Sequence, residues 1–541
     1  MATTSRICAA LVGAALLLSG CVGGATPTAG PSGSASTAAG SSPASSSPTA
    51  TVPANAISIS SVPGPAIDRP RFAPVSPTLD GMVAGLAGDG LSGYVTQQLD
   101  WNACDEDECA QVLVPLDYAD PSAAAITLSL KRKPATKSPR LGTLFINPGG
   151  PGASGTELVD GFASAGLEQY DILGWDPRGT AGSTPVHCFD DEQADAFSTL
   201  DGSPDDEAER EALIEAAYTF GESCWQNSGA LLEHISTIDT VRDLDLLRRL
   251  VGDDKLNYLG YSYGTQIGAT YAELFGQNSG RLVLDAAVNI TDNDDVIQAM
   301  GFDLALGNFA AWCASDGCAL GSSKAEVLDR ITGLLDDLDQ APLEVGERKL
   351  TQTLAATGIA AMLYGGESTW STLASSILAA TKGRGEALLW GADYLNSRSE
   401  DGTYDTMFFA FPAISCADDS TEQGVLDADQ LWQEDQQKAP IFGKYFGPQY
   451  TCPLWPVLPA RSLDIRGVSA PPLLVIGGTG DNATPYQQAK DMAAQLESGV
   501  LVTYEGEGHG TFGGKSTCVD RIVVNYLVNG VVPKDGVTCR R

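Results

Sequence analysis

The sequence predicts an α/β fold in which a mostly parallel β-sheet carries helices on both faces. From about residue 109 onwards, short apolar and β-branched runs alternate with stretches of helical periodicity. These runs are nearly continuous in apolar character, which is typical of strands buried on both faces of a sheet. Between about residues 291 and 411 the strand-like runs disappear and helical periodicity replaces them. This segment predicts a helical domain inserted into the sheet domain.

The strand-like runs occur in two groups on either side of the helical segment. They are Val112 to Leu116, Ile126 to Leu130, Leu144 to Asn147, Tyr170 to Trp175, Leu256 to Gly260, Leu282 to Leu284, Leu473 to Ile476 and Leu501 to Tyr504. The body of the protein is therefore predicted to have three parts. These are a first part of the sheet domain at 67–290, the helical insertion at 291–411 and a second part of the sheet domain at 412–541.

The composition limits the classes of protein to which the chain can belong. Its 541 residues are enough for about three domains, or for one large domain with an insertion. It has 32 Lys and Arg against 68 Asp and Glu, which gives a formal net charge of −36. Because this charge repels phosphate backbones, no nucleic acid is expected as a partner.

The amino-terminal residues have the pattern of an export signal. Arg6 precedes an apolar stretch from Ile7 to Leu18 that is too short to span a bilayer. The sequence Leu-Ser-Gly-Cys that ends at Cys21 resembles the bacterial lipobox, in which the cysteine is lipidated and becomes the first residue. We therefore expect residues 1–20 to be a lipoprotein signal peptide and Cys21 to anchor the protein to the outer face of the cell membrane. The alternatives are an ordinary secretory signal and a protein that is shed or secreted.

Residues 21–66 are predicted to form a disordered tether. No charged residue occurs between Arg6 and Asp68, and from Val22 to about Ala56 the chain is almost entirely Ser, Thr, Ala, Gly and Pro. Such a stretch cannot bury enough apolar surface to offset the entropy of ordering it.

Ten cysteines remain once Cys8 and Cys21 are assigned to the signal peptide and the lipid site. An even number of cysteines in an exported chain favours disulfides. Pairing by proximity in the sequence predicts five bridges: Cys104 with Cys109, Cys188 with Cys224, Cys313 with Cys318, Cys416 with Cys452, and Cys518 with Cys539. The alternative is a zinc site built from the two Cys-x4-Cys pairs. Neither pair has histidines nearby, so no metal is expected.

Ser262 is the candidate nucleophile. The motif Gly260-Tyr261-Ser262-Tyr263-Gly264 follows an apolar run and precedes a plausible helix from Gln266 to Phe275. A serine on a strained strand-to-helix turn projects its hydroxyl from the end of the sheet, and the flanking glycines remove Cβ atoms that would obstruct the turn.

A serine nucleophile needs a base, and the chain has three histidines. His509 lies in a glycine-rich loop directly after the last strand-like run, where its imidazole can lie over the sheet edge. We interpret His187 and His234 as surface or packing residues.

The imidazole in turn needs a carboxylate that fixes its tautomer. Asp481 follows the penultimate strand-like run and meets this need, whereas the rival acids Asp418 and Asp419 do not follow so clear a strand. The chain order Ser262, Asp481, His509 is that of the α/β-hydrolase fold.

The tetrahedral intermediate of such a triad needs two backbone N–H donors. One is expected from Tyr263, the residue after the nucleophile. The other is expected from the loop Asn-Pro-Gly-Gly-Pro-Gly at 147–152, with Gly150 favoured and Gly149 as the alternative. The loop lacks the spacing of a phosphate-binding motif, and we expect no cofactor.

Four motifs together resemble the actinobacterial tripeptidyl aminopeptidases, secreted or lipid-anchored α/β-hydrolases related to prolyl aminopeptidases. They are the 147–152 loop, the segment from Trp175 to Ser183, the serine motif and Gly508-His509-Gly510. The resemblance runs from about residue 100 to the end of the chain. It implies that Ser262, Asp481 and His509 form the triad, that Gly150 and Tyr263 are the oxyanion donors, and that the helical insertion forms a cap over the site.

The resemblance implies a serine exopeptidase that releases short peptides, expected to be tripeptides, from the amino terminus of a peptide or protein. Such an enzyme must recognise a free ammonium, for which a carboxylate is the physical choice. Asp418 resembles a recurrent family position and is the candidate. The same triad also suits an esterase or lipase, or an endopeptidase, and a third alternative is an inactive lipoprotein that binds peptide. The sequence does not fix the oligomeric state.

Overall fold

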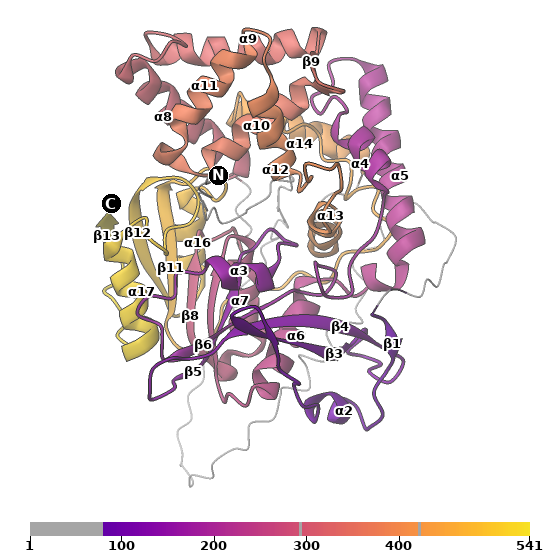
Figure 1. Ribbon diagram of the computed structural model, residues 1–541, viewed down its shortest axis with the longest axis vertical. Coiled ribbons are helices and arrows are strands. Elements are labelled where there is room, and N and C mark those ends of the chain that lie inside the picture. The colour runs from indigo at the N-terminus through magenta and orange to yellow at the C-terminus, as the bar shows by residue number, and fades with distance from the viewer. Residues whose placement is uncertain (1–78, 80, 292–294, 420–423) are drawn as a thin grey trace, which may run out of the picture.

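The computed structural model describes residues 79, 81–291, 295–419 and 424–541 (Figure 1). The predicted signal peptide 1–20, the lipidation site Cys21 and the tether 21–66 lie outside the described residues. Within the described ranges, no helix has both the length and the apolar character needed to cross a bilayer.

A single 11-stranded sheet forms the centre of the described part of the chain, and its strands follow the order β13-β12-β11-β8-β7-β5-β6-β4-β3-β2, with β1 paired to β4. Its strands are β1 (Val83–Ala84), β2 (Asn102–Cys104), β3 (Asp107–Pro115), β4 (Ala124–Lys133), β5 (Gly142–Asn147), β6 (Tyr170–Trp175), β7 (Leu256–Tyr261), β8 (Ser279–Asp285), β11 (Leu473–Gly480), β12 (Gly499–Glu507) and β13 (Val537–Arg540). The seven strands from β6 to β13 along this order pair in parallel, and β1 to β4 join them antiparallel. The predicted fold class, a mostly parallel sheet, is confirmed.

Burial explains why the strands could be recognised in the sequence. Every residue of β5 and β6 is buried, because helices cover both faces of the sheet there. Buried and half-exposed positions mix along β3 and β4, at the antiparallel end. Each of the eight predicted runs coincides with a strand, whereas β1, β2 and β13 are short and gave no signal.

Helices cover both faces of the sheet (Figure 1). One apolar cluster joins the sheet to α6 (Thr237–Leu250), α7 (Tyr263–Leu274) and α16 (Tyr486–Gln495). A second cluster, on the other face, joins it to α3 (Gly155–Gly161) and α17 (Thr517–Asn529). Among the described residues, the remaining helices outside the insertion are α2 (Ser92–Val95), α4 (Asp191–Ser198), α5 (Glu207–Leu232) and the short 3-10 turn η2 (Gly276–Asn278).

The chain between β8 and β11 is largely helical and forms the cap. Its elements are α8 (Gln298–Asp316), α9 (Lys324–Gln340), β9 (Leu343–Val345), β10 (Arg348–Leu350), α10 (Gln352–Leu363), η3 (Gly366–Ser368), α11 (Trp370–Ala380), α12 (Glu386–Leu395), α13 (Met407–Asp418), α14 (Val425–Lys438) and α15 (Phe442–Tyr445). The cap has an apolar core of its own, separate from the two clusters on the sheet. In Figure 1 its helices lie above the sheet, with α13 between the rest of the cap and the sheet domain.

Two details of the cap differ from the sequence pattern. The boundary expected at residue 411 falls inside α13, and helices continue to Tyr445. A small hairpin of β9 and β10 interrupts the helices. Its strands have three residues each, too few for a period-two pattern to show.

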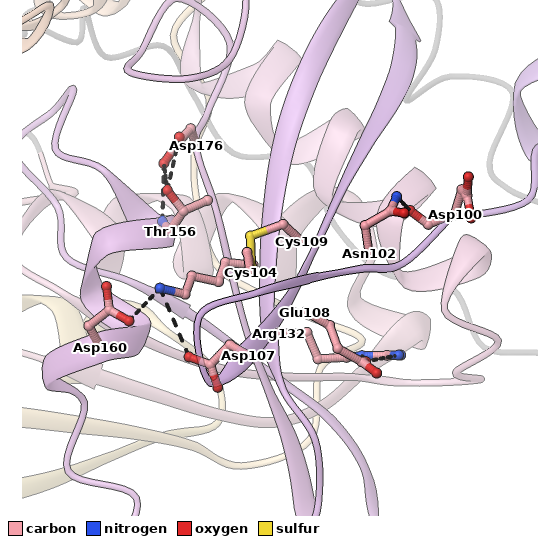
Figure 2. Close-up of a disulfide and its surroundings, with 11 residues drawn as sticks. Asp100, Asn102, Cys104, Asp107, Glu108, Cys109, Arg132, Thr156, Asp160 and Asp176 are labelled. Carbon is pink, nitrogen blue, oxygen red and sulfur yellow. Dashed lines mark hydrogen bonds and ion pairs between the residues drawn. A yellow bond between two sulfur atoms is a disulfide. The ribbon is translucent and has the colours of Figure 1, made fainter.

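The described residues form five disulfides, and all five pairings predicted by proximity are confirmed. Cys104–Cys109 closes the hairpin of β2 and β3, where Arg132 of β4 forms an ion pair with Glu108 (Figure 2). Cys416–Cys452 lies in the cap region instead, where it links α13 to the segment that follows α15.

Candidate active site

Ser262 lies at the turn between β7 and α7. Its backbone has φ 55° and ψ −127°, a strained conformation for a residue with a side chain. The Ser262 N–H donates to the main-chain oxygen of Asp285 at 3.0 Å, which helps to hold the turn. A Cβ on Gly260 would lie 2.4 Å from the carbonyl oxygen of Gly264, so the two glycines of the motif permit the close approach of strand and helix.

His509 and Asp481 form a hydrogen-bonded pair at the ends of β12 and β11. The His509 Nδ1 atom lies 2.9 Å and 3.1 Å from the two carboxylate oxygens of Asp481. Burial acts to raise the pKa of Asp481, but the neighbouring imidazole and the N–H of Thr484 outweigh it and hold this pKa below its ordinary value. Asp481 is therefore ionised and able to fix the imidazole tautomer.

The second ring nitrogen of His509, Nε2, is buried and makes no hydrogen bond with any described residue. Because Nδ1 faces Asp481, Nε2 is the atom that can take a proton from a nucleophile. The structure thus brings Asp481 and His509 into direct contact. Ser262 lies at the end of β7 in the same sheet, where β8 separates β7 from β11.

The loop after β5 lies against the serine turn. A Cβ on Gly149 would lie 2.5 Å from the Tyr261 oxygen and 3.0 Å from the Ser262 Cβ, so only glycine fits this approach. Gly150, Ser262 and Tyr263 line one cavity. Tyr263 is the first residue of α7, where the helix dipole places positive partial charge. The two predicted oxyanion donors therefore flank the candidate nucleophile.

Polar contacts hold both ends of this loop. At its start, the Gly149 N–H donates to the side chain of Asn147 at 2.9 Å. At its end, Asp176 accepts from the Ser154 hydroxyl at 2.7 Å and from the Thr156 N–H at 3.1 Å; the Thr156 contact is visible in Figure 2. Asp176 therefore positions the loop rather than taking part in chemistry.

Arg178, from the same motif, has a structural role. It is fully buried and forms an ion pair with Asp243 of α6 at 2.7 Å. Its other donors reach the main-chain oxygens of Pro115, Leu116 and His234. The other two histidines have contacts of their own. The backbone of His187 bonds the Ser228 hydroxyl, and the His234 main-chain oxygen accepts from Arg178.

Asp285 is a site residue that the sequence reasoning missed. It ends β8, is fully buried, and accepts the N–H groups of Thr511 and Phe512 in the loop of His509, at 3.0 Å and 2.6 Å. Burial raises its pKa to about 6. Since its main-chain oxygen also holds Ser262, Asp285 joins the loops of the nucleophile and the base. The available signal was its position directly after the apolar run from Leu282 to Leu284.

The cap also contacts the candidate base. The His509 N–H donates to the main-chain oxygen of Tyr364 at 3.1 Å, and the Tyr364 ring meets the imidazole edge-on with centroids 5.4 Å apart. From the sheet domain, Lys515 Nζ donates to the His509 oxygen at 2.7 Å. No sequence motif marks Tyr364 or Lys515, because both act through tertiary contacts.

Asp418 lines the cavity of Ser262, as an amine-binding residue should. Its carboxylate accepts the N–H of Thr237 at 2.8 Å, and the Thr237 hydroxyl contacts the other oxygen. Burial raises the pKa of Asp418 to about 7. Asp419 lines a different cavity, and the acid in contact with His509 is Asp481.

In the described ranges, one cluster has carboxylates close enough together to hold a metal ion, namely Asp205, Asp206 and Glu209. Asp206 and Glu209 form the capping box at the start of α5. The cluster therefore has a structural explanation.

Comparison with known proteins identifies the family. The model of the family described as TAP-like protein matches residues 439–539. The serine protease Hip1 of Mycobacterium tuberculosis is 36% identical over 464 residues, which cover 80% of this chain and 87% of that protein. The tripeptidyl aminopeptidase of Streptomyces coelicolor is 30% identical over 465 residues, which cover 81% and 84%. The chain belongs to the tripeptidyl aminopeptidase family.

The chain is also similar to a protein that is named as an esterase. Carboxylesterase B of Mycobacterium tuberculosis is 35% identical over 476 residues, which cover 82% of this chain and 90% of that protein. The sheet topology, the serine turn and the family membership together make the protein a serine peptidase of the α/β-hydrolase type.

Proposed function

We propose that the protein is a serine aminopeptidase that releases tripeptides from the amino terminus of peptides or proteins. The observation that carries this proposal is a cavity that both Ser262 and Asp418 line. The same cavity is also lined by Val296, Ile297 and Gln298, at the start of α8, so it lies between the sheet domain and the cap. A nucleophile and a buried carboxylate in one enclosed space suit a substrate with a free ammonium near the cleaved bond.

The proposed reaction proceeds through an acyl-enzyme. The Ser262 oxygen attacks the substrate carbonyl carbon while His509 Nε2 takes the hydroxyl proton. The N–H groups of Gly150 and Tyr263 stabilise the oxyanion, and Asp481 stabilises the imidazolium. The imidazolium then protonates the leaving nitrogen, the C–N bond breaks, and the amino-terminal peptide remains as an ester on Ser262.

Water completes the cycle. It attacks the ester carbonyl as His509 takes one of its protons, and the same two N–H groups stabilise the second oxyanion. Collapse of this intermediate releases the peptide as a carboxylic acid and returns the proton to the Ser262 oxygen. The reaction consumes one water and needs no other reactant.

Asp418 is proposed to bind the substrate ammonium. Each carboxylate oxygen has two lone pairs, so both can accept a further hydrogen bond beside those from Thr237. Burial keeps water from screening the attraction between the two charges. A bound ammonium favours the ionised carboxylate, which offsets the effect of burial on the pKa of Asp418.

An esterase is the second candidate function, because the relative named carboxylesterase B shares most of this chain's length and the triad cleaves esters by the same steps. An endopeptidase that needs no free amine is the third. The buried carboxylate in the Ser262 cavity favours the aminopeptidase, since burying a charge beside a neutral ester or a long chain is unfavourable.

Three reporters distinguish these functions: a tripeptide amide with a free amine, the same peptide acetylated, and an acetate ester. We expect the wild type to cleave the free-amine peptide much faster than the acetylated one, and Ser262→Ala to abolish the activity. Asp418→Asn is expected to raise KM for the free-amine peptide about tenfold or more while leaving ester hydrolysis nearly unchanged, because charged hydrogen bonds contribute about 1.5–3 kcal/mol. Equal cleavage of both peptides would indicate an endopeptidase, and cleavage of the ester alone an esterase.

We also propose that the protein is exported and anchored by lipid at Cys21 to the outer face of the cell membrane, on the pattern of residues 1–21. The expected result is recovery of the wild type in the membrane fraction and of Cys21→Ser in the soluble or unprocessed fraction. Mass spectrometry of the mature amino terminus would show an acylated cysteine. An unmodified first residue downstream of Cys21 would indicate an ordinary secretory signal instead.

A further inference from the structure

A second cavity borders α13, as the Ser262 cavity does. It is enclosed by α4, α5, α10, α12 and α13 and by the segment from Tyr445 to Cys452, and its volume is about 190 Å³. Nothing in the triad or the oxyanion loop uses it. We call this cavity the aromatic chamber, because its wall includes Phe197, Phe220, Phe408 and Phe411.

The aromatic chamber adjoins the catalytic cavity at α13. Phe411 and Ser415, one helical turn apart, line both spaces. These two side chains therefore lie between a substrate bound at Ser262 and the chamber. A group that extends from the substrate past Phe411 and Ser415 enters the chamber.

Ring contacts and a disulfide hold the wall of the chamber. Phe197 and Phe220 stack with centroids 5.2 Å apart, and Phe408 meets Phe197 edge-on at 6.4 Å. Cys416, which also lines the chamber, is fixed by its disulfide to Cys452. An apolar cavity of about 150 Å³ is enough to hold a benzene ring, so this chamber has room for an aromatic side chain.

One polar group is positioned for a specific contact. Asn396, at the end of α12, lines the chamber and is only 8% exposed. Its side-chain amide makes no hydrogen bond with the described residues, and its polar atoms are not sealed from the cavity that it lines. A hydroxyl on the end of an aromatic ring would supply the missing partner, whereas an alkyl chain would leave the amide unpaired.

We propose that the aromatic chamber is a specificity pocket for an aromatic side chain, with tyrosine preferred over phenylalanine, on the amino-terminal side of the cleaved bond. This inference rests on the proposed aminopeptidase function, and it adds the substrate class. Phe411 and Ser415 form the entrance, the phenylalanine rings contact the substrate ring, and Asn396 bonds its hydroxyl. The same space would suit the acyl chain of an ester, but the unpaired amide and the nearby Asp418 favour the peptide.

The test fills the chamber without touching the triad. Thr357 of α10 lines it, and Thr357→Phe places a ring inside. The matched control is Thr372→Phe, the same change at an exposed position of the neighbouring helix α11. The substrates are three series of free-amine tripeptide amides, one series for each position of the tripeptide. Within a series, that position is Tyr, Phe or Ala. They are compared with an acetate ester, whose acyl group is too small to reach the chamber.

The wild type is expected to prefer Tyr and Phe over Ala at one position by about tenfold or more in kcat/KM, as burial of an aromatic side chain provides. Thr357→Phe is expected to remove this preference and to leave ester hydrolysis within about twofold, while Thr372→Phe changes neither. The second variant is Asn396→Leu. One hydrogen bond is expected to give the wild type a preference for Tyr over Phe of about two- to tenfold, and this preference should disappear in the variant. The preference for Phe over Ala should remain.

Other results would overturn the inference in distinguishable ways. Cleavage of free-amine peptides with no aromatic preference, or with a preference that Thr357→Phe leaves intact, would exclude the chamber as the pocket while keeping the aminopeptidase. Failure of the wild type to cleave any free-amine peptide would refute the aminopeptidase itself. In that case, ester hydrolysis that accelerates with alkyl chain length and loses this dependence in Thr357→Phe would assign the chamber to an acyl chain. Loss of ester activity in Thr357→Phe would indicate a damaged fold. The preference for Tyr over Phe in Asn396→Leu would then decide whether the chamber is the specificity pocket.

Discussion

Asp285 joins the two loops on which the chemistry depends. Its carboxylate holds the N–H groups of Thr511 and Phe512 beyond His509, and its main-chain oxygen holds Ser262. We expect Asp285→Ala to lower kcat about 100-fold, because misplacing a catalytic group by about 1 Å has an effect of this size. Asp285→Asn retains one acceptor oxygen and is expected to lose less. Steady-state kinetics should show the loss in kcat with little change in KM, and a loss confined to KM would contradict a positioning role.

The two buried carboxyls Asp285 and Asp418 also predict how stability depends on pH. Burial raises their pKa values to about 6 and about 7, above those of the unfolded chain. Their contribution to the free energy of unfolding is therefore fully present below about pH 4 and is lost as the pH rises through 6 to 7. Urea unfolding should show Asp418→Asn gaining stability relative to the wild type between pH 5 and pH 8. The exposed control Asp427→Asn should show no such trend, and parallel profiles for all three proteins would contradict the prediction.

At the scale of elements, α13 is the helix that both cavities share, and Cys416–Cys452 fixes it. This disulfide closes a loop with a sequence separation of 36, against 5 for Cys104–Cys109. Loop-closure entropy predicts that replacing Cys416 and Cys452 by serine lowers the free energy of unfolding by about 4 kcal/mol. The same change at Cys104 and Cys109 is predicted to lower it by about 2 kcal/mol. We also expect the Cys416 and Cys452 variant to lose peptidase activity below its melting temperature, since α13 carries Asp418. Full activity in that variant would show that α13 needs no such restraint.

The elements also show what the sequence could predict. Strands β5 and β7 were visible because near-continuous burial leaves near-continuous apolar runs, and the serine turn was visible because its geometry requires two glycines. The hairpin of β9 and β10 was too short to leave a pattern. Asp285 and Tyr364 act through contacts between segments far apart in the chain, and no local pattern records such contacts.

The whole molecule combines a sheet domain and a cap, each with its own apolar core, and the candidate site lies where they meet. The full chain has a formal net charge of −36. A field of this sign attracts a cationic substrate, and salt screens the attraction. We expect kcat/KM for a free-amine peptide to fall as ionic strength rises from about 0.01 M to 0.15 M, while the acetylated peptide and the ester show no fall. A flat dependence for all three substrates would indicate that long-range charge has no role in substrate capture.

The most direct test of the account is to trap the acyl-enzyme. The enzyme is mixed with an activated ester of a free-amine tripeptide, quenched in acid, digested and analysed by mass spectrometry. The account predicts that the fragment containing Ser262 gains the mass of the tripeptidyl group, and that neither Ser262→Ala nor an acetylated form of the same ester produces this adduct. Turnover without an adduct on Ser262, or turnover that persists in Ser262→Ala, would contradict the claim that this protein is a serine aminopeptidase.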